Sequence, residues 1–196
     1  MKTYTKQKNP LFIYSPGQDN PLKDTKKKLL EGTGSMDLSG AWLSPFDFSQ
    51  LSSMSLLKNS DQSFGVFGNF GKGKVFAFGH PVIFGKQVSQ NAPSRRFIQN
   101  ILNWMTNSKK EQISVGLLFK SGDDWPSYSW DQNLEMKISS KFVESAEEFS
   151  SQDIICVTYY SHYPKALTPE VIAKLKTYVA NGGNLFFDSH GWAWKE

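Results

Sequence analysis

The pattern of apolar and polar residues becomes regular at residue 64, where two apolar runs predict a β-hairpin. Residues 64–70 and 75–78 are rich in phenylalanine and valine, and Gly71-Lys72-Gly73 separates them. A short connection that contains glycine is typical of a hairpin. We expect the two glycines to adopt positive φ angles in a three-residue turn, and Lys72 and Lys74 to keep its tip in solvent.

Two later segments show the spacing of amphipathic helices. The first has an apolar face of Phe97, Ile98, Ile101, Leu102 and Met105, with Ser94 as the expected N-cap and an end near Asn107. The second has Thr168 as the expected N-cap and Pro169 as its first residue. Its expected buried face is Val171, Ile172, Leu175, Tyr178 and Val179, and 181-NGG-183 is expected to end it. A shorter helix is expected over residues 23–30.

Apolar runs of strand length alternate with these helices. Residues 113–119, 153–160 and 185–187 are almost continuously apolar, as strands buried on both faces are, and short strands are expected at 11–17 and 136–138. Strands that alternate with helices favour a parallel sheet. The sequence therefore predicts an α/β fold with a mostly parallel, flavodoxin-like sheet flanked by helices and preceded by the β-hairpin.

The same pattern suggests three parts of the chain. Residues 1–10 are expected to form a flexible basic arm, residues 11–108 an N-terminal part with the hairpin and a helix, and residues 109–196 an α/β part. The chain ends shortly after the apolar run at 185–187. We therefore expect the α/β part to be truncated relative to a longer protein.

Composition narrows the class of protein. Apolar residues make up 39% of the 196 positions and aromatic residues 14%, which is a globular composition. Much of the net charge of +4 lies in the first 28 residues, which indicates a solvated arm and no nucleic-acid surface. Neither a secretory signal nor an apolar run long enough for membrane insertion is visible, so we expect a cytoplasmic protein. The single cysteine, Cys156, lies inside an apolar run and is expected in the core.

The three histidines, His80, His162 and His190, each follow an apolar run, and Asp188 lies beside the last of them. Ligands of open α/β sheets bind at the carboxyl ends of the strands, so these four residues form a candidate ligand rim. They could hold zinc or transfer protons, or they could be hydrogen-bonding loop residues. Their spacing matches no metal motif, and we assign no catalytic residue, metal or cofactor.

Several motifs together resemble the N-terminal part of the channel-associated factor family. They are 71-GKGKVFAFGH-80 followed by 97-FIQNILNWM-105, then 113-ISVGLLF-119, then 182-GGNLFFDSHGWAW-194. The positions that match the family pattern are Gly71, Lys72, Gly73, His80, Asn100, Trp104, Gly182, Gly183, Ala193 and Trp194.

The resemblance implies a class I glutamine amidotransferase-like fold, although the nucleophile motif G-x-C-x-G is absent from the sequence. It also implies a protein partner, a melastatin-type TRP channel. We therefore expect a non-enzymatic protein-binding domain that regulates the channel or its traffic to the cell surface, cytoplasmic or peripheral at the plasma membrane. The alternatives are a hydrolase or small-ligand or metal-binding domain that uses the strand-end histidines, and the accessory domain of a zinc metallopeptidase.

Overall fold

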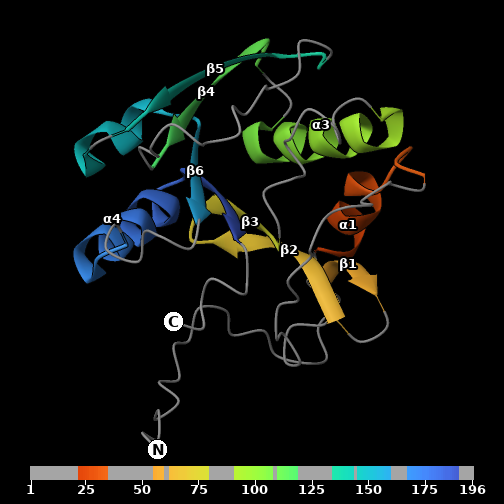
Figure 1. Ribbon diagram of the computed structural model, residues 1–196, viewed down its shortest axis with the longest axis horizontal. Helices are drawn as coiled ribbons and strands as arrows, with labels where there is room; N and C mark the ends of the chain where they lie inside the picture. The colour runs from red at the N-terminus through yellow and green to blue at the C-terminus, as the bar shows by residue number, and fades with distance from the viewer. Residues whose placement is uncertain are drawn as a thin grey trace, which may run out of the picture.

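The computed structural model describes residues 22–34, 55–59, 62–79, 91–107, 110–118, 134–143, 145–159 and 167–189. Its centre is a seven-stranded sheet of order β1-β2-β3-β7-β6-β4-β5 (Figure 1). Neighbours from β3 to β5 run parallel, whereas β1, β2 and β3 pair antiparallel. The strands are β1 Ser55–Asn59, β2 Gln62–Phe70, β3 Gly73–Phe78, β4 Gln112–Leu117, β5 Lys137–Phe142, β6 Ile154–Tyr159 and β7 Asn184–Ser189. The predicted α/β fold with a mostly parallel sheet and a hairpin is confirmed.

Helices cover both faces of this sheet. The helices α1 (Lys23–Leu29) and α3 (Ala92–Thr106) pack on one face, and α4 (Pro169–Ala180) and the 3₁₀ helix η3 (Ala146–Ser151) pack on the other (Figure 1). Strand β6 contributes to both layers, since Cys156 lies in the α3 cluster and Ile155 and Val157 lie in the α4 cluster. Cys156 is buried, as predicted. No helix in the described ranges is long and apolar enough to cross a membrane.

The hairpin of β2 and β3 has a tighter turn than the sequence predicted. Phe70 pairs with Gly73, so only Gly71 and Lys72 lie between the strands. Gly71 has a φ of +59°, as expected for a turn glycine. Gly73 is already the first residue of β3 and has no positive φ, so the prediction of a second turn glycine with a positive φ is wrong.

Helix α3 begins three residues earlier than expected. Its N-cap is Asn91, and Pro93 lies within the first turn, so the prediction of Ser94 as N-cap is wrong. The physical reason is that proline is tolerated in a first turn, whose N–H groups have no intrahelical partners. The helix ends at Asn107 in the left-handed conformation with a φ of +61°, where the sequence predicted its end.

Helix α4 begins and ends as predicted. The Thr168 hydroxyl accepts a hydrogen bond from the Val171 N–H at 3.2 Å, and Pro169 is the first helical residue. At the other end Gly182 has a φ of +113°, and the N–H of Gly183 donates to the Tyr178 carbonyl at 3.0 Å. These bonds satisfy carbonyls that the helix leaves unpaired.

The prediction of the buried face of α4 is wrong at one residue. Ile172 is 39% exposed, whereas Leu175 and Val179 are buried. Helix α1 matches its prediction, but β1 and η3 were not predicted, and β5 is longer than expected. The strand expected at 11–17 lies outside the described residues.

Candidate functional site

The carboxyl ends of three strands meet at one edge of the sheet. In the parallel registers, Asp188 of β7 lies between Phe78 of β3 and Thr158 of β6. This is the adjacency that the candidate ligand rim requires. His80, His162 and His190 lie outside the described residues, as does the side chain of Asp188. The rim therefore stays a prediction.

The four family-matching glycines form one close contact, which we call the glycine junction. Gly71 and Gly73 of the hairpin lie against the end of α4 and the Gly182-Gly183 loop. The N–H of Lys72 donates to the Ala180 carbonyl at 3.0 Å.

The glycine junction leaves no room for side chains at three of its positions. A Cβ atom on Gly73 would lie 2.1 Å from the Gly183 carbonyl oxygen, and one on Gly71 would lie 2.6 Å from the Ala180 Cα atom. A Cβ atom on Gly183 would lie 2.2 Å from the Tyr178 ring. Close packing thus explains Gly71, Gly73 and Gly183, whereas Gly182 is explained by its φ of +113°.

Lys74 and Trp104 join β3 to the end of α3. The Lys74 ammonium donates to the Trp104 carbonyl and, at 2.6 Å, to the Asn107 side-chain oxygen. It lies 5.5 Å from the centre of the Trp104 ring, whose edge meets Phe67 at a centroid distance of 5.6 Å. Burial lowers the pKa of Lys74. Lys74 neutralises the negative end of the α3 dipole. Trp104, another position that matches the family pattern, has a structural role too, because it packs against Lys74 and Phe67. Trp194 lies outside the described residues.

Beside this contact is a shallow cavity of about 450 Å³, lined by Thr25, Lys28, Leu29, Glu31, Lys74, Asn100, Asn103, Trp104 and Asn107. Asn100 takes part in holding α1, because its amide donates to the carbonyls of Leu29 at 3.1 Å and Glu31 at 2.9 Å. Lys74 and Asn100 both bond to groups of the protein itself. We therefore interpret this cavity as part of the contact between α1 and α3.

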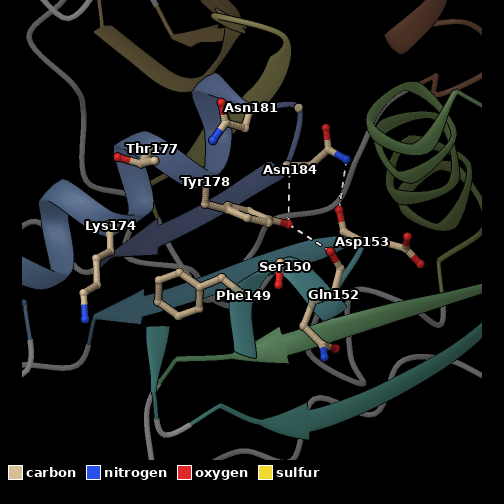
Figure 2. A pocket seen from close by; sticks show the side chains of 11 residues that line it. Phe149, Ser150, Gln152, Asp153, Lys174, Thr177, Tyr178, Asn181 and Asn184 are labelled. Atoms are coloured by element: carbon tan, nitrogen blue, oxygen red, sulfur yellow. Dashed lines mark hydrogen bonds between the residues drawn. The ribbon is translucent and has the colours of Figure 1, made fainter. Parts of the chain in front are cut away.

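A larger pocket of about 550 Å³ lies at the amino edge of the sheet, opposite the carboxyl edge where the candidate ligand rim was predicted. Here Asp153 immediately precedes β6 and Asn184 begins β7 (Figure 2). Its lining residues are Phe149, Ser150, Gln152, Asp153, Lys174, Thr177, Tyr178, Asn181, Gly182, Gly183 and Asn184. The sequence did not predict this pocket, because the candidate site was sought only among residues that follow the apolar runs. The polar residues that precede those runs were the available signal.

Tyr178 occupies the middle of the amino-edge pocket. Its hydroxyl donates to the Gln152 carbonyl at 3.1 Å and accepts from the Asn184 N–H at 3.2 Å (Figure 2). Burial raises the pKa of Tyr178 to about 12, and the nearby charge of Asp153 acts in the same direction, against the bond from Asn184. The phenol therefore stays protonated at neutral pH and ties α4 to the starts of β6 and β7.

Asp153 links three strands at the same edge. Its carboxylate accepts hydrogen bonds from the Ser114 N–H at 2.9 Å, from the Ser114 hydroxyl at 3.1 Å and from the Lys110 ammonium. Its carbonyl accepts from the Asn184 side chain at 2.9 Å (Figure 2). Burial pushes the pKa of Asp153 up, but the bonds from Lys110 and Ser114 outweigh it and the pKa is lowered. The Asp153 carboxylate of this pocket is thus engaged in holding the sheet, whereas Lys174 pairs with Glu147 and Glu170 on the helices.

Within the described ranges, no three histidine, cysteine, aspartate or glutamate side chains lie close enough together to hold a metal ion. In both pockets described above, central polar groups bond to the protein itself, Tyr178 and Asp153 in one and Lys74 and Asn100 in the other.

Comparison with solved structures places the fold. The chain resembles the IMPa metallopeptidase in complex with T-antigen, with a TM-score of 0.57 and 13% identity over 86% of this chain and 20% of that one. It resembles the IMPa metallopeptidase from Pseudomonas aeruginosa with a TM-score of 0.53 and 13% identity over 70% of this chain and 16% of that one. The complex of IMPa with an O-glycopeptide gives 0.56, with 14% identity over 86% and 20%. At these identities the likeness concerns the fold, and the chain spans about a fifth of the metallopeptidase or less.

Sequence comparison then identifies the family. The family model TCAF_N, described as "TRPM8, N-terminal domain", matches residues 4–196. Because this match covers nearly the whole sequence, the chain belongs to the TCAF family, as the motifs predicted. A search of curated proteins finds no significant match.

Proposed function

We propose that this chain is a non-enzymatic protein-binding domain that regulates a melastatin-type TRP channel or its delivery to the cell surface, from the cytoplasmic side. The observation that carries the proposal is the TCAF_N match over residues 4–196, whose description names TRPM8. The structure adds support at Tyr178, Asp153 and Lys74, because these ionisable groups bond to backbone and side chains of the domain itself.

The proposal is tested by co-purification of the tagged chain with full-length channel from cultured cells, together with surface biotinylation of the channel. We expect the chain to co-purify with TRPM8 and to change the amount of channel at the surface. A channel of another TRP subfamily serves as the control. Equal recovery of both channels, or of neither, contradicts the proposal.

Two exposed apolar side chains make it possible to localise the interface. Among the described residues, the large apolar side chains that are exposed are Phe142 of β5 at 46% and Ile172 of α4 at 39%. They lie on different elements, so Phe142→Ser and Ile172→Ser each serve as the matched control for the other. Loss of co-purification in only one variant assigns the interface to that element.

A second candidate function uses the carboxyl edge, as a metal or small-ligand site of His80, His162, Asp188 and His190. The observation that favours it is the register of β3, β7 and β6, in which Phe78, Asp188 and Thr158 lie side by side. Elemental analysis of the purified chain and calorimetric titration with zinc test it. Stoichiometric metal that is lost in His80→Ala and His190→Ala supports a site, and the absence of metal and of heat rejects it.

The likeness to IMPa favours a third candidate, an accessory domain of a zinc metallopeptidase. It is tested by comparing the peptidase activity of a longer protein that contains this domain with and without residues 4–196. A change in substrate affinity at unchanged turnover supports an accessory role, and unaltered kinetics reject it.

A further inference from the structure

The strand β5 is the last strand in the order of the described sheet, and its outer edge is exposed. It pairs with β4 on one side and with no other described strand. Five of its six residues are exposed, and only Ile138 is partly covered. Figure 1 shows β5 at the rim of the molecule, at the other end of the sheet from β1. The edge of an exposed strand presents backbone N–H and carbonyl groups that can pair with a strand of another chain.

Alternate residues of β5 present their backbone groups to this edge. The N–H groups of Lys137 and Val143 donate to carbonyls at the beginning and the end of β4, at 2.9 and 3.0 Å. In a strand that pairs in parallel, the backbone groups of successive residues point to opposite sides. The N–H and carbonyl groups of Ile138, Ser140 and Phe142 therefore point away from β4, toward the outer edge.

The side chains of β5 give its two faces different chemistry. Ile138 packs against the α3 cluster, and Phe142, four residues further on, lies on the same side of the sheet and is 46% exposed. Lys137 and Lys141 lie on the opposite side, where the Lys141 ammonium donates to the Glu148 carboxylate at 3.0 Å. One face of β5 is therefore apolar at its ends, and the other is basic.

We propose that two copies of this chain pair through β5 as antiparallel strands, about a two-fold axis at Ser140, and so join their sheets into one. A two-fold axis perpendicular to the sheet keeps the same face of both copies on the same side. With the axis at Ser140, Ile138 of each copy lies opposite Phe142 of the other, so these apolar side chains cover each other. The outward backbone groups of the three residues then face one another and form the hydrogen bonds of the new pair.

The positions of the lysines favour this register. With the axis at Ser140, Lys141 of each copy lies opposite Ser139 of the other, and Lys137 lies opposite Val143. An axis at Ser139 overlaps the two strands equally, but it places Lys137 of each copy opposite Lys141 of the other. Like charges directly opposite each other destabilise a pair of strands, and an axis farther along in either direction pairs fewer residues. The sequence of β5 is thus complementary to itself, which identifies the occupant of the edge as a second copy.

The first test is the mass of the purified chain in solution as a function of concentration, measured by sedimentation velocity. One pair of short strands buries less than the roughly 1,200 Å² of a standard interface, so we expect a dissociation constant of about 10–100 µM. The average mass should rise from that of one chain toward that of two across this range. Hydrogen exchange at Ile138 and Phe142 should slow over the same range, whereas in dilute solution it stays fast. A mass that remains that of one chain overturns the proposal.

The second test is a charge swap at Ser140, which lies opposite its own copy in the proposed dimer. Ser140→Lys and Ser140→Asp should each weaken self-association at least tenfold, because like charges then meet at the axis. An equimolar mixture of the two variants should associate again, because opposite charges meet. Ser140 is exposed, so the variants should keep the fold of the wild type.

Two controls complete this test. Ser140→Ala changes no charge and should associate as the wild type does. Ala173→Lys adds the same charge to the exposed face of α4 and should also associate normally. The proposal is overturned if the mixture associates no better than either Ser140 variant alone, or if Ala173→Lys weakens association as much as Ser140→Lys. Because the channel is absent from these measurements, their outcome is independent of the proposed function.

Discussion

At the scale of single residues, the glycine junction shows two different reasons for a glycine in one short turn. Gly71 needs its positive φ of +59°, which other residues rarely adopt. Gly73 lies in the extended first position of β3 and is required because neighbouring carbonyl oxygens fill the space of a side chain. A turn motif read from the sequence cannot distinguish these cases, since the second depends on the α4 end far along the chain.

Replacing Gly73 by alanine should therefore be strongly destabilising. The added Cβ atom would lie 2.1 Å from the Gly183 oxygen and 2.2 Å from the Val179 oxygen, so the backbone has to move. We expect a loss of about 3 kcal/mol in the free energy of unfolding, measured by denaturant titration. The control is Gly65→Ala in the adjacent strand, where a Cβ atom meets nothing closer than 3.4 Å. That variant should stay within about 1 kcal/mol of wild type, and similar losses in both would contradict the packing explanation.

Tyr178 should couple stability to alkaline pH. Because its pKa in the folded protein is raised to about 12 from the ordinary value of 10.0, the folded state holds the proton more tightly than the unfolded chain. The resulting stability is fully present below pH 10 and is lost as pH rises toward 12, by roughly 2 kcal/mol.

Tyr178→Phe lacks this titration and leaves the Gln152 carbonyl and the Asn184 N–H without their partner. At neutral pH it should be less stable than the wild type by about 1–2 kcal/mol. Chemical denaturation of both proteins at several pH values measures the difference. A difference that stays constant from pH 9 to 12 would show that the hydroxyl does not titrate as proposed.

At the scale of elements, the boundaries that depend on only a few neighbouring residues could be predicted from the sequence. Thr168 and Pro169 fix the start of α4 through one hydroxyl and one restricted φ, both visible in the sequence. The start of α3 was misplaced because Asn91 and Ser94 are both favourable N-cap types, and tertiary packing decides between them. Strand β5 is mostly exposed, and its sequence KISSKF lacks a buried face, so periodicity indicated only a short strand.

The Thr168 cap offers a test at this scale. Thr168→Ala should lower the free energy of unfolding by about 1 kcal/mol, because the Val171 N–H loses its acceptor. Thr177→Ala in the same helix is the matched control. Its exposed hydroxyl bonds only to the Ala173 carbonyl within the helix, so its loss should change stability much less. Equal effects of the two substitutions would rule out a capping role.

At the scale of the whole molecule, the sheet order could not be derived from periodicity. The hairpin strand β3 pairs with β7, and β6 lies on the other side of β7, so the last described strand is central. Local sequence carries no information on which distant strands pair. The same limit applies to the carboxyl edge, where the sequence suggested convergence of strand ends but could not show that β3, β7 and β6 are neighbours.

Hydrogen exchange should reveal this arrangement. β7 is paired along both edges, from Lys74↔Asn184 on one side to Tyr159↔Ser189 on the other. β5 pairs only with β4 among the described strands. We expect amides of Leu185–Phe187 to exchange with the global unfolding reaction and those of β5 much faster. Mass spectrometry of peptic fragments measures both, and equal rates would contradict the order of the sheet.

The central position of β7 also has a consequence for the nascent chain. β3 leaves the ribosome early, but its parallel partner begins only at Asn184. At about 10 residues per second, the hairpin waits on the order of ten seconds with the edge of β3 unpaired and the rings of Phe76 and Phe78 uncovered on that side. Unpaired edges and exposed aromatic rings attract other chains and chaperones. We therefore expect folding of this domain to require protection of β3 until β7 arrives, and products that end before β7 to aggregate.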